Sequence, residues 1–208
     1  MTRAVALATG DVLAGRPARQ REGSAPLILA ALRERRSRPM LGLPGPDATD
    51  VDEMLVAAMS APDHGRLRPW RFIVIDGDAR TGLGDAFAAA HAARSPESRP
   101  EDIERARAKA HRAPMIIVVV AAPQEHPTIG AWEQRASAVC VAHGILLAAD
   151  ALGYGAFWRT GWLSEAPEVR SHIGLADHED VTGWIYLGSP MGRPAPRVTP
   201  EPPVSWLT

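Results

Sequence analysis

The stretch from Trp132 to Leu152 limits the possible folds of this chain more than any other. It is the longest helix candidate in the sequence. One broad face of this helix carries, at helical spacing, Ala136, Val139, Cys140, His143, Leu146, Leu147 and Ala151. Ile145, Ala148 and Ala149 make much of the remaining surface apolar too, and a helix that is apolar nearly all round must be buried on nearly all sides. The pattern predicts that this helix forms either the central axis of the domain or the centre of an obligate dimer interface.

Size and composition are those of an ordinary soluble globular protein. The 208 residues are enough for one domain, or one domain with a tail, that buries roughly 70% of its unfolded surface. A hydrophobic share of 46% and a net charge of -1 give no reason to expect nucleic acid or a membrane as a partner. The single cysteine, Cys140, excludes an intramolecular disulfide and fits a reducing, cytoplasmic environment.

The N-terminal stretch is expected to be a flexible extension. Residues 1–24 contain one short apolar run, Ala4 to Ala8, followed by glycine, proline and arginine. This run is too short for a membrane span and lacks the pattern of a secretory signal. The arginines of residues 1–24 faintly resemble those of an organelle transit peptide, but a disordered N-terminal segment fits the pattern better. We therefore predict an extension over residues 1–24 and one domain over residues 25–208.

Periodicity and turn residues predict the other elements. Helices are expected at 26–36 and at 167–173, and two more on the surface between 79 and 112. A further helix, capped by Thr49 or Asp50, is expected to end with the stretch from Val51 to Met59. Strands are expected at 71–76, at 115–122 and at 181–187, with 156–161 as a short connection. The unbroken apolar run at 115–122 indicates a central strand covered on both faces. Gly183, inside the last strand, predicts a bulge or a close approach of another group.

Three basic clusters predict a phosphate site. They are Arg35 to Arg38, Arg66 to Arg71, and Arg159 with Thr160, with Arg193 later in the chain. A guanidinium group binds phosphate through bidentate, charge-assisted hydrogen bonds, and a neighbouring hydroxyl can fill the next position. Each cluster alone is more simply explained as a solvated face. Their placement at the ends of elements, beside a serine or a threonine, favours two of them meeting around one phosphate.

Several other sites are not supported. The sequence has no Gly-x-Gly-x-x-Gly motif opening a helix after a strand, and no Walker loop. The histidines show no metal-binding spacing, so no metal site is predicted. Cys140 and His143 are interpreted as core or interface residues, because nothing nearby completes a nucleophile and base arrangement.

An ordered set of short motifs resembles the nitroreductase family of flavoproteins, and especially its small single-domain YdjA-like branch. The motifs are Arg35-Arg36-Ser37, the turn from Ala61 to Trp70, Trp132-Glu133-Gln134, the helix end from Ala148 to Gly153, Trp158-Arg159-Thr160-Gly161 and Tyr186-Leu187-Gly188. Each motif alone is weak, but the order is specific and covers about residues 26 to 192.

The resemblance implies an α+β fold in which a mostly antiparallel central sheet is flanked by helices. It also implies an intertwined homodimer with two flavin sites at the subunit interface. The long apolar helix would then form the dimer core, and the proline-rich C-terminal tail would embrace the partner subunit.

The same resemblance implies the residues that bind FMN. Arg35, Arg36 and Ser37 would hold its phosphate and ribityl chain, Trp158, Arg159 and Thr160 would line it, and Ser60 and His64 would reach it from the other subunit. Arg193 would be a further cation for the phosphate. Nicotinamide contacts are implied along Ala148, Ala149, Asp150, Ala151, Leu152 and Gly153, although these residues are expected to be buried. Relatives often carry asparagine and glutamine where this chain has Arg66 and Arg68, so those two arginines are not assigned.

The implied activity is that of an FMN-dependent NAD(P)H oxidoreductase. It would reduce nitroaromatic, quinone-like or other electron-poor small molecules in a ping-pong cycle. The chemistry would take place on flavin N5, so no catalytic side chain is assigned. The alternatives are a flavin-binding or flavin-handling protein with little turnover, and a related flavin reaction such as dehalogenation.

Overall fold

The structure is a computed structural model that describes residues 25–193 and 199–207. The chain divides into two compact units, Met1–Glu34 and Arg35–Thr208. In the first unit, helix α1 (Ala25–Glu34) starts one residue earlier and ends two residues earlier than the helix predicted at 26–36. The predicted extension at 1–24 lies outside the described residues, and the predicted domain boundary stays a prediction.

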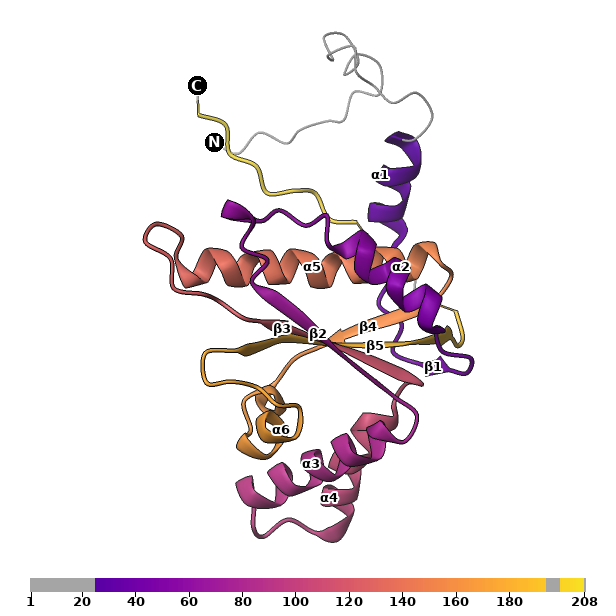
Figure 1. Ribbon diagram of the computed structural model, residues 1–208. Coiled ribbons are helices and arrows are strands. Elements are labelled where there is room, and N and C mark those ends of the chain that lie inside the picture. Colours follow the sequence, from indigo (N-terminus) through magenta and orange to yellow (C-terminus); the bar gives the residue numbers. More distant parts are fainter. Residues whose placement is uncertain (1–24, 194–198, 208) are drawn as a thin grey trace. The chain divides into compact units, whose positions relative to one another are not determined.

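The described residues of the second unit form a mixed α+β fold around a five-stranded antiparallel sheet (Figure 1). The strands are β1 (Leu41–Gly42), β2 (Trp70–Asp76), β3 (Met115–Ala121), β4 (Gly155–Arg159) and β5 (Asp180–Pro190). Strands β1, β5, β3 and β2 lie in that order, and β4 pairs with β5. The predicted fold class and the strands predicted at 71–76, 115–122 and 181–187 are confirmed. The connection predicted at 156–161 was wrong, because most of it is strand β4.

Helices cover both faces of this sheet (Figure 1). Their bounds are α2 (Ala48–Ala58), α3 (Ala79–Arg94), α4 (Pro100–Arg107), α5 (Ala131–Ala151) and α6 (Pro167–His172). Strand β3 is buried along its whole length. Ile117 and Val119 pack with α2 and α5, whereas Ile116 and Val118 pack with α3 and α6. The prediction of a central strand covered on both faces is therefore confirmed.

Helix α2 has its cap two to three residues earlier than predicted. Asp47 is the N-cap: its Oδ1 accepts a hydrogen bond from Asp50 N at 2.9 Å, and Asp50 Oδ2 accepts one from Asp47 N at 3.4 Å. Two aspartates three residues apart thus form a reciprocal capping box. Neither Thr49 nor Asp50 is the cap, because both already lie inside the helix.

Gly183 provides both features that were predicted for it. The register of β3 against β5 shifts where Val119 pairs with Gly183 and Val120 pairs with Val181, so Thr182 is the extra residue of a bulge. A β-carbon at Gly183 would overlap the indole of Trp158, which donates a hydrogen bond from Nε1 to Thr182 O at 3.3 Å. The absent side chain therefore lets β4 place a large aromatic group close against β5.

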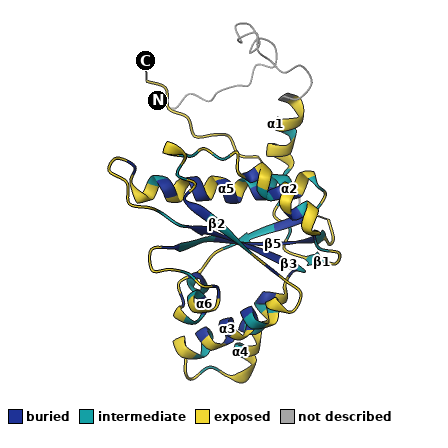
Figure 2. Ribbon diagram, viewed as in Figure 1, coloured by how far each residue is buried: buried dark blue, intermediate teal, exposed yellow. Residues whose placement is uncertain are grey.

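Helix α5 is buried on one side only within the chain (Figure 2). Its buried side includes Val141, Ala142 and Ile145, together with Leu146 at 6% exposure. The face predicted from the sequence is largely exposed: Val139 is 47% exposed, and Ala136, Cys140, His143 and Ala151 are exposed as well. The single chain does not bury the helix on all sides, so the prediction that this helix is the fully buried axis of the domain was wrong.

None of the helices within residues 25–193 and 199–207 combines the length and hydrophobicity needed to cross a membrane. The C-terminal residues 199–207 have no regular secondary structure, and Val204, Trp206 and Leu207 are exposed there.

Candidate functional site

Strand β4 brings two of the predicted cofactor segments together. Ser37 forms a parallel bridge with Ala156, and Arg38 N donates a hydrogen bond to Ala156 O at 2.9 Å. The segment Arg35-Arg36-Ser37 therefore lies beside the start of the strand whose far end carries Arg159. The first basic cluster therefore lies against the same strand that carries Arg159.

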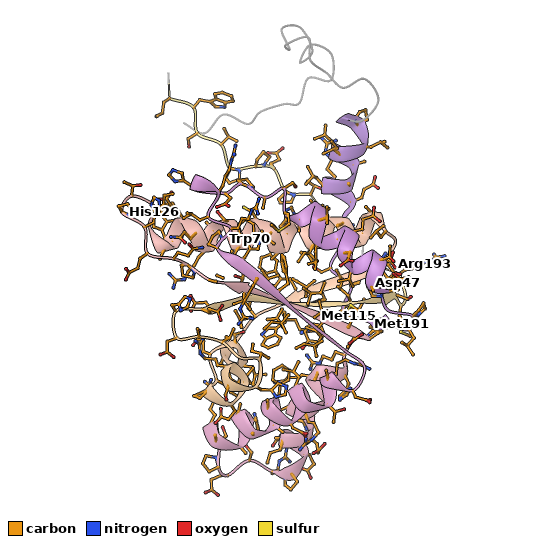
Figure 3. The ribbon with its side chains drawn as sticks, viewed as in Figure 1. Asp47, Trp70, Met115, His126, Met191 and Arg193 are labelled. Carbon is orange, nitrogen blue, oxygen red and sulfur yellow. The ribbon has the colours of Figure 1, made fainter. Side chains whose placement is uncertain are left out.

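The end of β5 joins the same region. A β-carbon at Gly155, the first residue of β4, would contact the β-carbons of Arg38 and Pro190. Met191 N donates a hydrogen bond to Met40 O at 3.0 Å, so the chain leaving β5 runs beside the segment that follows Arg38. Arg193 comes two residues later, and Figure 3 shows it beyond the end of the sheet. No contact between Arg193 and the Arg35 cluster is seen among the described residues, so its role as a phosphate cation stays a prediction.

A cavity of about 220 Å³ opens beside Arg159, on the face of the sheet covered by α3. Its walls are Phe87, Lys109, Arg112, Arg159, Thr160, Gly161, Trp162, Leu163, Trp184 and Tyr186. Three cations and four aromatic rings therefore surround one space. Such walls complement a flat aromatic ligand that carries or develops negative charge.

The three cations of this cavity destabilise one another. Burial lowers the pKa of the Arg159 guanidinium, and the charge of Arg112 lowers it further. Burial also lowers the pKa of Lys109, with added repulsion from Arg112 and Arg159. No carboxylate among the described residues pairs with any of the three. The cavity therefore has a local excess of positive charge that a bound anion would neutralise.

Aromatic rings position Arg159. Its Cζ lies 4.2 Å from the centre of the Phe157 ring and 5.7 Å from that of Tyr186. Burial raises the pKa of the Tyr186 hydroxyl to about 12, against the opposing effect of Arg159 and Arg112. Tyr186 therefore stays neutral near neutral pH and provides a hydroxyl rather than a phenolate to the cavity.

Trp158 does not share this cavity. Adjacent residues of a strand point to opposite faces, and Trp158 packs against the cluster formed with α2 and α5. The structure thus separates the side chains of Trp158 and Arg159, although both belong to the predicted cofactor segment.

Ser60 and His64 lie on the loop between α2 and β2, near the first turn of α5. Ser60 Oγ donates to Ala57 O at 2.8 Å, and His64 Nδ1 lies 2.8 Å from Glu133 Oε2. The hydrogen bond from His64 lowers the pKa of Glu133. Within the described part of the chain, neither side chain forms a hydrogen bond with the Arg35 cluster or with β4. Their assignment to the flavin of the other subunit stays a prediction.

The residues predicted to contact nicotinamide form the last turn of α5 and its cap. Ala149 is buried, and Ala148 and Leu152 are half-buried. Asp150, Ala151 and Gly153 are exposed, so the expectation that this segment is buried was wrong for these three residues. The next residue, Tyr154, donates from its hydroxyl to Asp50 Oδ2 at 2.5 Å and thereby fixes the turn against α2.

Lys109 and Arg112 line the cavity but were not predicted from the sequence. Both lie in the region interpreted as surface helices, where isolated basic residues are usually solvated. Their position directly before the central strand β3 could have indicated a role, because side chains at the end of a buried strand can point into a cavity. No group of His, Cys, Asp or Glu side chains able to hold a metal ion occurs in the residues that the structure describes.

Comparisons with known proteins agree with the fold described above. A family model described as "Nitroreductase family" matches residues 32–189. "Putative NAD(P)H nitroreductase YdjA" of Escherichia coli strain K12 is 36% identical over 180 residues, which are 86% of this chain and 97% of that protein. A nitroreductase-like family protein from Bacillus cereus has a TM-score of 0.72 at 24% identity, covering 84% of this chain and 91% of its own. A nitroreductase with bound FMN from Bacteroides fragilis NCTC 9343 has a TM-score of 0.66 at 20% identity, covering 87% and 98%. The two solved structures share the fold described above.

Proposed function

This chain belongs to the nitroreductase family, and on that premise we propose that it is an FMN-dependent NAD(P)H oxidoreductase acting on electron-poor small molecules. Nitroaromatic and quinone-like compounds are the acceptors that we expect. The observation that carries the proposal is the cavity beside β4, where Lys109, Arg112 and Arg159 face aromatic walls without a carboxylate partner among the described residues.

The residues present fit FMN, which joins a flat aromatic ring to a dianionic phosphate. Arg35, Arg36, Ser37 and Arg193 would bind the phosphate and ribityl chain. Arg159 and Thr160 would line the same molecule from the end of β4, and Lys109 and Arg112 would add positive charge beside it. The curated relative described above is named an NAD(P)H nitroreductase, and one fold neighbour carries bound FMN.

Bound FMN would supply the redox chemistry, taking a hydride from NAD(P)H and passing the electrons to the acceptor in a ping-pong cycle. The protein's part is electrostatic. Preorganised cations stabilise negative charge that develops beside them, and they do so most strongly where water is excluded. Lys109, Arg112 and Arg159 meet this requirement because they are held near aromatic walls. No side chain has to act as a general acid or base.

We further propose that the working unit is an intertwined homodimer. Helix α5 leaves an apolar face uncovered, with Trp132 73% exposed and Val139 47% exposed. A second copy of the chain would cover this face, and the C-terminal residues would embrace the partner. Ser60 and His64, which form no hydrogen bond with the Arg35 cluster within the described residues of their own chain, would then serve the flavin of the other subunit. A reducing cytoplasm suits such an enzyme, whose single cysteine, Cys140, is free.

The test is spectroscopic. Purified protein should show flavin absorption, bleach on anaerobic mixing with NADH or NADPH, and recover its colour when a nitroaromatic or quinone is added. A protein that is colourless and takes up no added FMN would overturn the proposal. A coloured protein that nicotinamide bleaches only very slowly in a stopped-flow experiment would instead identify a flavin-binding protein with little turnover.

A further inference from the structure

The turn between His64 and Trp70 has an uncommon backbone. Gly65, Arg66 and Arg68 have φ values of 73°, 56° and 48°, all in the left-handed region. Glycine adopts this conformation freely, whereas an arginine there is sterically strained. Two arginines in one short turn therefore occupy positions where glycine or asparagine would be less strained. Residues held in such conformations often mark sites where a ligand is bound.

Hydrogen bonds from separate segments hold this turn. Asp63 accepts twice: its backbone O from Arg66 N at 3.3 Å and its Oδ2 from Arg68 N at 2.7 Å. Trp70 N donates to Arg68 O at 2.7 Å as the chain enters β2, where Figure 3 labels Trp70. Gln124 Nε2 donates to Leu67 O at 3.1 Å. The turn is thus fixed in its strained shape before any ligand arrives.

The side chains of Arg66 and Arg68 are exposed, and neither pairs with an acidic side chain within the described residues. Three acids bind this loop or the first residue after it, and none of the three pairs with the side chain of Arg66 or Arg68. Asp63 binds the backbone of Arg68, Glu133 binds His64, and Glu179 binds Arg71. The turn therefore presents two charges that the described chain leaves available for an external anion.

From this geometry we propose that the turn Gly65 to Arg68 binds a phosphate or carboxylate on a molecule that exchanges electrons with the flavin. The inference rests on the proposed function, in which Ser60 and His64 of this loop face the partner subunit's flavin. Arg66 and Arg68 then lie at the edge of that site, where the second ligand enters. A guanidinium fork binds either anion in a bidentate manner, so the two residues select for charged ligands.

The anion can belong either to the nicotinamide dinucleotide or to the electron acceptor. The two half-reactions of a ping-pong cycle can be measured separately and so distinguish these sources. NADPH differs from NADH by one phosphate, and 4-nitrobenzoate differs from 4-nitrobenzyl alcohol mainly by its charge. The test variant is Arg66→Asn with Arg68→Asn, because asparagine tolerates the left-handed conformation and removes both charges. This variant should melt at a higher temperature than the wild-type enzyme and should keep its FMN.

The expected result is a fall of about tenfold or more in kcat/KM for a charged ligand, as for the loss of one charge-assisted hydrogen bond. A fall for NADPH alone, or for both nicotinamides, assigns the turn to a phosphate of the dinucleotide. A fall for 4-nitrobenzoate but not for 4-nitrobenzyl alcohol assigns it to the acceptor. As a matched control, Arg99→Asn with Arg105→Asn removes two charges from the α4 region, and its kinetics should equal those of the wild type.

Unchanged kinetics with all four ligands would overturn the inference, and so would an equal fall for both nitro compounds with no change for either nicotinamide. Loss of FMN from the asparagine variant would also overturn it, since the arginines would then hold the flavin itself. If the wild-type protein binds no FMN, the proposed function fails instead, so the two failures are distinguishable.

Discussion

Arg159 occupies a position that costs free energy unless an anion is bound. Burial and the neighbouring Arg112 both lower its pKa, while the rings of Phe157 and Tyr186 hold its guanidinium in place. FMN binding would relieve the repulsion in the cavity. The affinity for FMN, rather than the stability of the fold, is therefore the property that Arg159 should control.

Replacing Arg159 with alanine should weaken FMN binding by roughly 1.5 to 3 kcal/mol, as expected for the loss of hydrogen bonds to a charged group. Arg35→Ala should have an effect of similar size. Quenching of FMN fluorescence during titration of the apoprotein measures the affinity. Arg99→Ala is the control, because Arg99 pairs with Asp102 at the start of α4 and lines no part of the cavity. Unchanged affinity in both test variants would contradict the phosphate assignment.

Glu179 makes the stability of the fold depend on pH. Its side chain is 8% exposed, and hydrogen bonds from Arg71 Nε and Nη2 lower its pKa from 4.5 to about 2. A lowered pKa stabilises the folded state fully above pH 4.5, and this contribution is lost as the pH falls toward 2. The shift corresponds to about 3 kcal/mol.

Urea unfolding of Glu179→Gln should therefore give a lower free energy of unfolding than the wild type near neutral pH. The gap should start to narrow below pH 4.5 and should be much smaller at about pH 3, between the unfolded and folded pKa values of this carboxyl. A gap that stays constant across this range would show that Glu179 contributes through packing rather than through its charge.

At the scale of elements, β4 and β5 fit together because Gly183 has no side chain. Gly183→Ala would drive a methyl group into the Trp158 indole, and overpacking of this kind costs about 1 to 3 kcal/mol. We expect a lower free energy of unfolding and a changed near-ultraviolet circular dichroism signal. In the double variant with Trp158→Ala, the loss of unfolding free energy should be smaller than the sum of the losses in the two single variants. A loss equal to that sum would exclude this contact as the cause.

The elements predicted correctly are those with a strong local pattern. Strand β3 and helix α5 can be predicted from local sequence, because a strand buried on both faces is apolar throughout and a long, partly buried helix carries apolar residues over many turns. Strand β4 was missed because it is short and begins within a turn that contains two glycines. Strand β1 has two residues and depends on its pairing with β5, so no local pattern could predict it.

The candidate site was predictable only in part for a similar reason. Arg35 and Arg159 stand in recognisable motifs, and the bridge between Ser37 and Ala156 places the first motif beside the strand that carries Arg159. Lys109 and Arg112 belong to no such motif, and only the tertiary structure reveals that they line one cavity with Arg159. Residues that gain their role from tertiary contacts carry little signal in their own segment.

For the whole molecule, the question is whether the exposed apolar face of α5 forms a dimer interface. The sequence pattern places Leu146 on the interface side, but Leu146 is 6% exposed and packs in the chain's own core. A charge at that position would unfold the subunit. Val139, at 47% exposure on the same helix, tests the interface without disturbing that core.

Val139→Glu should convert a dimeric wild type into a monomer and release FMN, because the proposed interface would bury a carboxylate without a partner. Light scattering after size-exclusion chromatography gives the mass, and absorption of the same peak gives the flavin content. Ala89→Glu, at an exposed position of α3 on the other layer, is the control and should stay dimeric and coloured. A folded Val139→Glu monomer that keeps its FMN would show that one chain completes the flavin site, and Ser60 and His64 would then need another role.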